Sequence, residues 1–355
     1  MYFIGSCYFI GIAAWEQIKP KLTNANLVVA FSALLVVILA GIRYEVGTDY
    51  ITYFNAFQGL LQDPNFFPQF EVGWCYITYF LSYVGFDVYG IFAFWACVAI
   101  LPFYYGLQRY SPYPLFSFCC FFLVYNAPCL YNFMRQTVVM GILIGSIGLI
   151  KERRHVPLFF IFLFAVSIHR SAIILLLFYF LIEIKSIEKY RYAILIAAFT
   201  LGWFSVSKTL LLHLSPLVMP GSIIRKIEAY FVYRQGGLDV VNILQRMFVL
   251  VPALIFYKPL VRAWKYNEVT IGFYFWGCVV YFLLADSYDI ATRLNTTTKI
   301  LDIIIVPSFL CIAKGSVKIL LFVLIILWGV SVLYAFLFMS LHSDCYYPFR
   351  TIFAS

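Results

Sequence analysis

Six polar residues interrupt a strongly apolar chain, and their side chains are of the types that bind anions and transfer protons. They are Arg43, Asp49, Glu71, Arg135, His169 and Arg293. A guanidinium group binds phosphate or carboxylate through paired N–H donors. Histidine and glutamate can take a proton from a hydroxyl group. Cations that stabilise a leaving group, together with a base for an incoming hydroxyl, favour a group-transfer reaction.

Arg135 and His169 lie in short polar interruptions between apolar runs. Arg135 stands in Asn132-Phe133-Met134-Arg135-Gln136, and the nearest acidic residues along the chain are Asp87 and Glu152. Its guanidinium either extends to the membrane surface or binds a substrate anion. His169-Arg170-Ser171 lies at the turn of a short hairpin, where the imidazole is either a structural residue or one that contacts substrate.

Two further polar tracts carry the remaining candidates. Gly41-Ile42-Arg43-Tyr44-Glu45-Val46-Gly47-Thr48-Asp49-Tyr50 predicts a tight turn and then a helix capped by Thr48 or Asp49, lying at the membrane surface. Arg43 there either extends to the surface or binds an anionic head group. In the tract 286–295, Asp286 and Asp289 are most simply helix caps or partners of basic residues, because Asp289 and Arg293 stand at i and i+4. Arg293 is the better candidate for a site.

Composition identifies the elements that must position these residues. Apolar residues make up 64% of the 355 residues and charged residues 12%. The apolar runs are roughly 14 to 25 residues long, and a full span needs about 20. We therefore predict one membrane-embedded, all-α domain over 1–355 with about 12 transmembrane helices, several of them short or broken. The expected ranges are 2–15, 27–42, 88–107, 114–132, 137–150, 156–168, 171–184, 193–213, 245–257, 268–285, 300–313 and 316–340.

Basic residues predict the orientation of the chain. They cluster at Lys19/Lys21, Arg109, Lys151/Arg153/Arg154, Lys185/Lys189/Arg191, Lys258/Arg262/Lys265 and Lys314/Lys318. Under the positive-inside rule these clusters are cytoplasmic. The chain must then cross an even number of times between neighbouring clusters. The run 72–84 becomes a re-entrant or surface helix, and both termini lie outside.

This orientation places all six polar candidates on the outer face. Two longer outer loops join them, at about 43–87 and 214–244. His and Cys residues do not cluster at the spacing of metal ligands, so no metal site and no cofactor is expected. Phosphate or pyrophosphate is the kind of anion that several outward cations would bind.

The chain resembles the EpsG-like family of exopolysaccharide polymerases, similar in role to Wzy polymerases of O-antigen and capsule. The resemblance rests on the tract 41–50 followed by Tyr53, on Glu71-Val72-Gly73, on Phe133-Met134-Arg135-Gln136, and on Ile168-His169-Arg170-Ser171-Ala172-Ile173, with Arg293 near the end. It implies a protein of the bacterial inner membrane that transfers a growing glycan from undecaprenyl pyrophosphate onto a fresh lipid-linked repeat unit. Implied partners are a chain-length regulator and export machinery.

The resemblance and the residue types together assign roles. His169 is the expected base, with Glu71 as its competitor. The expected substrate-binding residues are Arg43, Asp49, Tyr50, Arg135, Arg170 and Arg293. Arg170 stands where the family is expected to vary. Two other functions fit the residues: a flippase for lipid-linked oligosaccharides, which needs a cavity open to both faces, and a ligase or other lipid-dependent glycosyltransferase, which differs in its acceptor.

Overall fold

The computed structural model describes residues 1–19, 25–62, 70–184, 186–206, 209, 213, 240–285 and 287–353. Within these residues every regular element is a helix, and extended backbone pairs only in an isolated bridge between Arg43 and Thr351. The all-α class predicted from the sequence is therefore confirmed. Most of the loop expected at 214–244, up to residue 239, lies outside the described residues, and so does Asp286.

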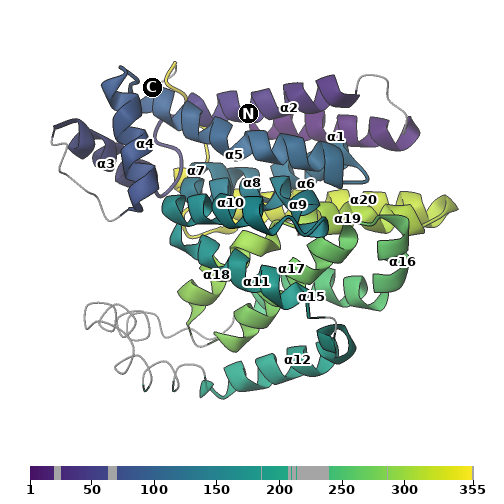
Figure 1. Ribbon diagram of the computed structural model, residues 1–355. Coiled ribbons are helices and arrows are strands. Elements are labelled where there is room, and N and C mark those ends of the chain that lie inside the picture. Colours follow the sequence, from purple (N-terminus) through teal and green to yellow (C-terminus); the bar gives the residue numbers. More distant parts are fainter. Residues whose placement is uncertain are drawn as a thin grey trace.

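The first part of the chain packs around one long helix, α5 (Val88–Tyr110). α5 lies between α2 (Ala25–Gly41) and α8 (Met134–Gly145), and α1 (Tyr2–Ile18) packs against α6 (Pro114–Val124). Figure 1 shows these helices running roughly parallel to one another across the molecule. Such side-by-side packing buries apolar side chains from every neighbour and forms a continuous core.

A second group of helices surrounds α17 (Asn267–Leu283). α12 (Ser186–Trp203), α15 (Val240–Ile255), α18 (Tyr288–Lys299) and α19 (Asp302–Ile312) all pack against it. The remaining elements are α3 (Tyr50–Gln62), α4 (Val72–Tyr83), α7 (Asn126–Tyr131), α9 (Ile147–Lys151), α10 (His155–Ile168), η1 (Arg170–Ala172), α11 (Ile173–Ile182), α16 (Tyr257–Ala263), α20 (Gly315–Tyr334), η2 (Ala335–Met339) and η3 (Ser343–Cys345). α10 packs against both α4 and α8, and thereby connects α4 to the core.

The helices are more broken than the sequence predicts. The runs 114–132 and 137–150 each form two helices, interrupted at Tyr125 and Ser146. The polar tract before residue 300 forms a helix of its own, α18, and α16 was not expected at all. Apolar composition predicts burial in a membrane, but it does not predict where a helix bends.

Two described helices are long and apolar enough to cross a bilayer, Val88–Tyr110 and Gly315–Met339. Two bent pairs raise the number to four: Val240–Ile255 with Tyr257–Ala263, bent by 77°, and Asp289–Lys299 with Asp302–Ile312, bent by 47°. Several other apolar helices are shorter than a full span. The chain is a membrane protein with short and broken helices, and the expected count of about twelve spans is not confirmed.

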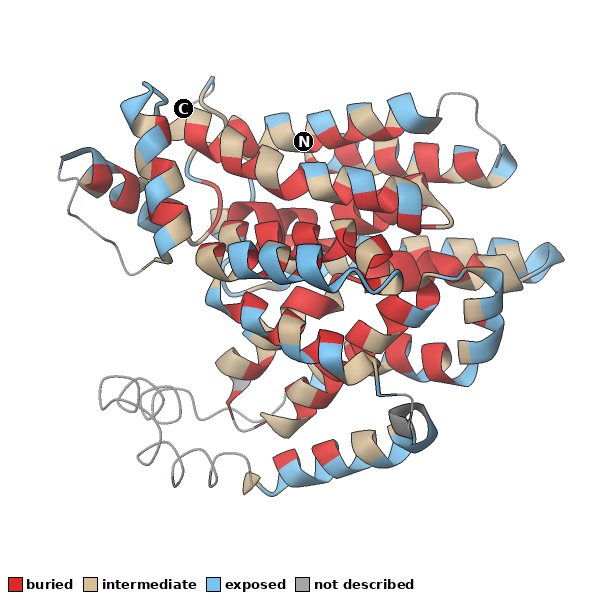
Figure 2. Cartoon of the chain, in the orientation of Figure 1, coloured by how far each residue is buried: buried red, intermediate tan, exposed pale blue. Residues whose placement is uncertain are grey.

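Large apolar side chains cover much of the outer surface. On α10, Phe159 and Phe160 are 52% and 62% exposed, and on α20, Leu320 and Leu327 are 57% and 58% exposed. Buried residues instead gather where the central helices meet (Figure 2). Broad apolar faces at this level of exposure suit contact with lipid.

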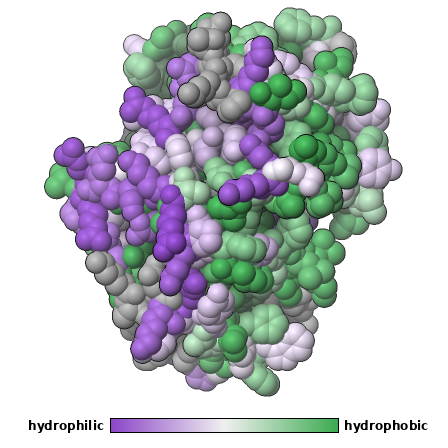
Figure 3. All heavy atoms as spheres, turned by 90° about the vertical axis from the view of Figure 1, so that its right-hand side faces the viewer, coloured by the Kyte–Doolittle hydropathy of each residue, from purple (hydrophilic) through white to green (hydrophobic). Residues whose placement is uncertain are grey.

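The basic residues at 151–154 and His169 lie at opposite ends of α10. At one end, Lys151 pairs with Glu268, Arg153 pairs with Glu183, and Trp264 donates to the carbonyl of Tyr110 at 2.7 Å. This is the right-hand end in Figure 1, and Figure 3 shows hydrophilic side chains beside hydrophobic ones on it. α10 runs 14 residues from this end, about 21 Å at 1.5 Å per residue, to the other. We call the end that holds Lys151, Arg153 and Trp264 the basic end.

Candidate functional site

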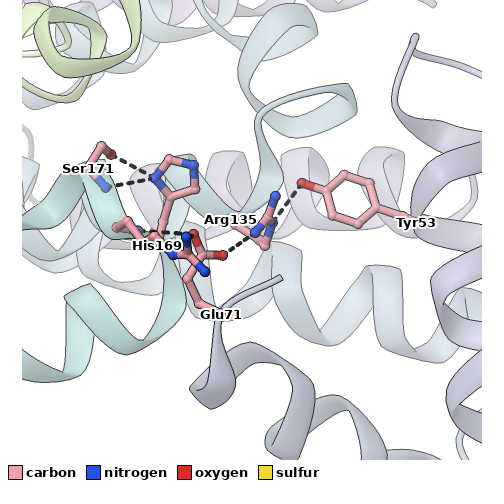
Figure 4. Close-up of polar contacts among 6 residues, drawn as sticks. Tyr53, Glu71, Arg135, His169 and Ser171 are labelled. Atoms are coloured by element: carbon pink, nitrogen blue, oxygen red, sulfur yellow. Dashed lines mark hydrogen bonds and ion pairs between the residues drawn. The ribbon is translucent and has the colours of Figure 1, made fainter. Parts of the chain in front are cut away.

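An ion pair between Arg135 and Glu71 forms the centre of the site (Figure 4). Arg135 is in the first turn of α8, and Glu71 immediately precedes α4. The Arg135 guanidinium carbon lies 4.0 Å from the centre of the Phe70 ring, and its Nε donates to the Tyr53 hydroxyl at 3.5 Å. The two charged side chains are 16% and 11% exposed. An arginine without a local acidic partner thus finds one that is distant in sequence.

A close approach between two helices brings Glu71 to this position. A Cβ atom on Gly73 would lie 2.3 Å from Ser167 Oγ and 2.8 Å from the Ser167 carbonyl oxygen. Only glycine therefore allows the start of α4 to pack so tightly against the end of α10. The tight packing places Glu71 beside His169 and Arg170, which directly follow α10.

Glu71 also holds the start of η1. Its Oε1 accepts a hydrogen bond from the backbone N–H of Arg170 at 3.1 Å, and the Arg170 Nε lies 4.0 Å from the same oxygen. The Arg170 side chain is 74% exposed, so its guanidinium is available to a ligand. One carboxylate thus links α8 to the turn that carries His169.

His169 is held from the side of its Nδ1 nitrogen. Nδ1 lies 2.7 Å from Ser171 Oγ and accepts the Ser171 backbone N–H at 3.3 Å. Burial lowers the pKa of His169 to about 4, and the charges of Arg135, Arg293 and Arg170 add to this, while Glu71 opposes it. The imidazole is consequently neutral near pH 7.

α18 contributes Arg293 to the same region. The Gln136 amide donates to the Arg293 carbonyl at 2.5 Å and to Thr297 Oγ1 at 3.0 Å, which fastens α18 to α8. The Arg293 side chain is exposed. Asp49 is half-buried between α2 and α3; burial raises its pKa, and the charges of Arg135, Arg293 and Arg43 lower it. Asp49, Glu71, Arg135, His169, Arg170 and Arg293 therefore share one electrostatic environment.

Arg43 and Tyr50 are buried in the interior next to this cluster. Arg43 is fully buried, with its guanidinium carbon 4.6 Å from the Phe92 ring centre and 5.6 Å from that of Tyr131. It donates to the carbonyl of Leu130. Tyr50 is 5% exposed, and its ring centre lies 5.4 Å from that of Phe92. Both were expected to contact substrate, and the structure instead places both side chains in the interior.

The turn after Arg43 is clamped against the connection between α7 and α8. Gly47 has a φ of +103°, which favours glycine, and a Cβ there would lie 2.2 Å from the Tyr131 carbonyl oxygen. Its N–H donates to the Cys345 carbonyl at 2.8 Å, and the Thr48 N–H donates to Asn132 Oδ1 at 2.7 Å. The glycine-containing motif therefore acts by placing Asp49 and Tyr53 beside Arg135.

Sequence reasoning missed a second polar group in the interior. Arg246 on α15 is 1% exposed, donates to Asn295 Oδ1 at 2.6 Å and lies 3.6 Å from the centre of the Tyr281 ring. Asp302 accepts from the Tyr125 hydroxyl at 2.5 Å. The available signal was a charged residue inside each of the apolar runs 245–257 and 300–313. Ser171, Gln136, Thr297 and Tyr53 were also not assigned to the site, because polar residues of these types rarely stand out.

The arrangement can bind an anion and transfer a proton. Guanidinium groups are the donors best suited to phosphate oxygens, and a carboxylate and a neutral imidazole stand beside them. Among the described residues, no three His, Cys, Asp or Glu side chains come together as metal ligands would.

Comparison with known proteins gives one result for nearly the whole chain. The model of the EpsG family matches residues 26–351. No curated protein matches the chain significantly. No solved structure matches it either.

Proposed function

The chain belongs to the EpsG family, and from this premise we propose that it polymerises oligosaccharide repeat units carried on undecaprenyl pyrophosphate. The proposed location is the bacterial inner membrane, with the site at the outer face. The proposed donor and acceptor are both lipid-linked oligosaccharides. A chain-length regulator and export machinery are the proposed partners, because a polymer made at this face needs control of its length and export from the membrane.

The proposed reaction is a glycosyl transfer. A hydroxyl oxygen of the incoming repeat unit forms a bond to the anomeric carbon of the donor glycan. The bond from that carbon to the pyrophosphate oxygen breaks, and its electron pair stays on the leaving undecaprenyl pyrophosphate. The hydroxyl proton passes to a base in the site. Cations are required where the negative charge develops.

The observation that carries this proposal is the convergence of Arg135, Arg170 and Arg293 around Glu71 and His169. Arg135 and Arg293 would hold the pyrophosphate, and the exposed Arg170 would help to attract it. Asp49 would orient the sugar near the cations. Arg43 would add positive charge from the interior, because its side chain is fully buried and donates to the Leu130 carbonyl.

The base is His169 or Glu71. His169 is neutral and so can accept a proton, but its Nδ1 is already engaged by Ser171. Glu71 is a carboxylate with hydrogen bonds to Arg135 and to the backbone of Arg170. A flippase or a ligase could also bind the pyrophosphate, so the test must identify the product.

Substitution of Arg135 tests the proposed site. Loss of its charge-assisted contacts should cost roughly 1.5–3 kcal/mol, which is about a ten- to hundredfold fall in polymer formation. Arg135→Lys should fail almost as badly, because a point charge cannot replace the guanidinium fork. Arg262→Ala, an exposed cation at the basic end, is the control and should be unchanged. The measurement is polymer made from a lipid-linked repeat unit at equal membrane abundance.

The glycans of a deletion strain separate the three functions. Single lipid-linked repeat units at the outer face indicate a missing polymerase. Complete polymer that is not attached to its acceptor would indicate a ligase, and repeat units retained at the inner face would indicate a flippase. Wild-type polymer length in Arg135→Ala would remove Arg135 from the site.

Orientation is tested by labelling single cysteines in intact cells. Cysteines at positions 135 and 169 should react with a membrane-impermeant reagent, because we expect the basic end to be cytoplasmic. A cysteine at position 262, at the basic end, should react only after permeabilisation. The reverse pattern would invert the orientation and exclude an outward-facing site.

A further inference from the structure

The hydrogen bonds of His169 define which of its nitrogens carries the proton. A backbone N–H can only donate, and the Ser171 N–H points to Nδ1 at 3.3 Å. Nδ1 must therefore supply a lone pair, and the tautomer is assigned from this donor. In a neutral imidazole the single proton then lies on Nε2. Figure 4 shows Nδ1 facing Ser171 and the other ring nitrogen pointing away from it.

A series of hydrogen-bonded side chains supports the assignment of the proton to Nε2. With Nδ1 as the acceptor, the Ser171 hydroxyl donates to it at 2.7 Å. Ser171 Oγ also lies 3.2 Å from Thr297 Oγ1, which accepts from the Gln136 amide at 3.0 Å. The Ser171 side chain is thus held between the imidazole and α18, with Ser171 7% exposed. Such a network fixes both the ring orientation and its tautomer.

We propose that Ser171 is a positioning residue that makes His169 a hydrogen-bond donor through Nε2, so that Glu71, and not His169, accepts the proton of the incoming hydroxyl. This inference rests on the proposed glycosyl transfer. None of the described residues forms a hydrogen bond with Nε2. An unpaired atom that is not in the buried unpaired set must be accessible, and Nε2 is not in that set. It is therefore free to donate to a pyrophosphate oxygen.

Glu71 retains the capacity to act as the base. Its Oε2 accepts from Arg135, and its Oε1 accepts from the Arg170 N–H. A carboxylate has about four lone-pair sites, so it can still accept the hydroxyl of a substrate. The proton then moves from the acceptor hydroxyl to Glu71, while the electron pair of the breaking bond moves to the pyrophosphate oxygen.

This transfer would couple the two halves of the reaction. A protonated Glu71 no longer attracts Arg135 as an ion, so the guanidinium charge becomes available as negative charge grows on the leaving group. His169 donates its Nε2 proton as a hydrogen bond and keeps it. Glu71 returns its proton to water after the products separate.

The first test reads the tautomer directly. The chain has four histidines, so nitrogen-15 labelling of histidine in the full-length protein in bilayers gives few signals, and His169→Gln identifies the one from His169. The expected wild-type spectrum at neutral pH shows the proton on Nε2. Ser171→Ala keeps the backbone N–H and should therefore keep the proton on Nε2, while the Nδ1 signal shifts because the hydroxyl donor is lost; Ser171→Thr should restore the wild-type Nδ1 signal. A wild-type ring with its proton on Nδ1 would overturn the proposal.

The second test compares two matched substitutions in the polymerisation assay. Glu71→Gln should lower kcat by about 10²–10⁴-fold, as loss of a general base does, with the KM for donor changed little. His169→Gln keeps an N–H donor and should lose less than tenfold. The opposite ranking would restore His169 as the base, and a Glu71→Gln effect confined to KM would make Glu71 a binding residue.

The two tests separate this inference from the proposed function. If the wild-type protein shows Nε2–H but forms no polymer from lipid-linked repeat units, then the polymerase proposal fails while the tautomer assignment stands. If polymer forms and the ring shows Nδ1–H, then the inference fails alone.

Discussion

Two polar clusters meet on the same helix, α18, and they differ in how far they are buried. The open cluster comprises Glu71, Arg135, His169, Arg170 and Arg293. The buried cluster comprises Tyr125, Arg246, Asn295 and Asp302. α18 contributes Arg293 to the first and Asn295 to the second, two residues apart. One short polar helix therefore serves both a site and the interior.

The difference between the two arginines shows what each cluster does. Arg246 is 1% exposed and has its guanidinium bonded to Asn295 and to the Asn242 carbonyl at 2.8 Å. Arg293 is exposed, and only its backbone carbonyl is bonded to α8. A buried, internally bonded cation holds helices together, whereas a cation at the surface is available to a ligand. Burial and bonding, rather than residue type, separate structure from function here.

After Glu71→Gln, the largest effect expected on activity is that of His169→Ala in the open cluster. This change removes both the ring and its N–H, and polymer formation should fall by about 10²–10³-fold, as for loss of a donor to a developing oxyanion. Binding of the lipid-linked donor should persist, since the arginines are intact. The measurement is kcat and donor affinity for the purified protein in bilayers. A near-normal kcat would show that His169 in the open cluster is not catalytic, and the functional contrast between the two clusters would then be wrong.

The largest effect expected on stability is that of Arg246→Ala in the buried cluster. Hydrogen bonds from a charged group typically contribute about 1.5–3 kcal/mol each, and the Arg246 guanidinium donates to Asn295 and to the Asn242 carbonyl. Arg293→Ala is the matched control, and an exposed substitution should stay within about 0.5 kcal/mol. Unfolding by denaturant in detergent measures both variants. Equal stability of the two variants would show that the buried arginine does not hold α15 to α18.

The smallest effect concerns pH. The pKa of His169 is about 4 in the folded protein, below its ordinary value of 6.5. Between these values the unfolded chain binds more protons, so the stability contributed by the neutral ring is complete above pH 6.5 and is lost as the pH falls toward 4. Activity should show no histidine titration between pH 6 and 8.

The control for this prediction is His169→Gln, which lacks the titrating ring. Its unfolding free energy should fall less than that of the wild type between pH 7 and pH 5. An inflection of wild-type activity near pH 6.5 that is absent from His169→Gln would contradict this prediction. It would show that the ring titrates near its ordinary pKa and that burial does not lower that pKa.

Several features of the site follow from sequence alone because they are local. The apolar runs at α1, α2, α5, α10 and α20 predict helices, since length and composition act within a single segment. The same runs make isolated polar residues conspicuous, and this identified Glu71, Arg135 and His169. The cytoplasmic location of the basic clusters stays a prediction of the positive-inside rule.

Other features follow only from tertiary packing. Arg43 belongs to the motif that carries the family resemblance, yet its guanidinium lies between Phe92 and Tyr131 in the interior. Arg246 and Asp302 stand in apolar runs and find partners on other helices. The identity of these partners depends on how helices cross, and residue spacing within one helix contains no information about that.

The sequence by itself determined that this is an all-α membrane protein of the EpsG family with a small set of polar residues. Only the tertiary structure decided that Arg135 pairs with Glu71 and that Gly73 permits the close contact between α4 and α10 beside this pair. The physical reason is the distance along the sequence over which each interaction acts. Apolar length acts within one helix, whereas Glu71 and Arg135 are 64 positions apart and meet only because α4, α8 and α10 pack together.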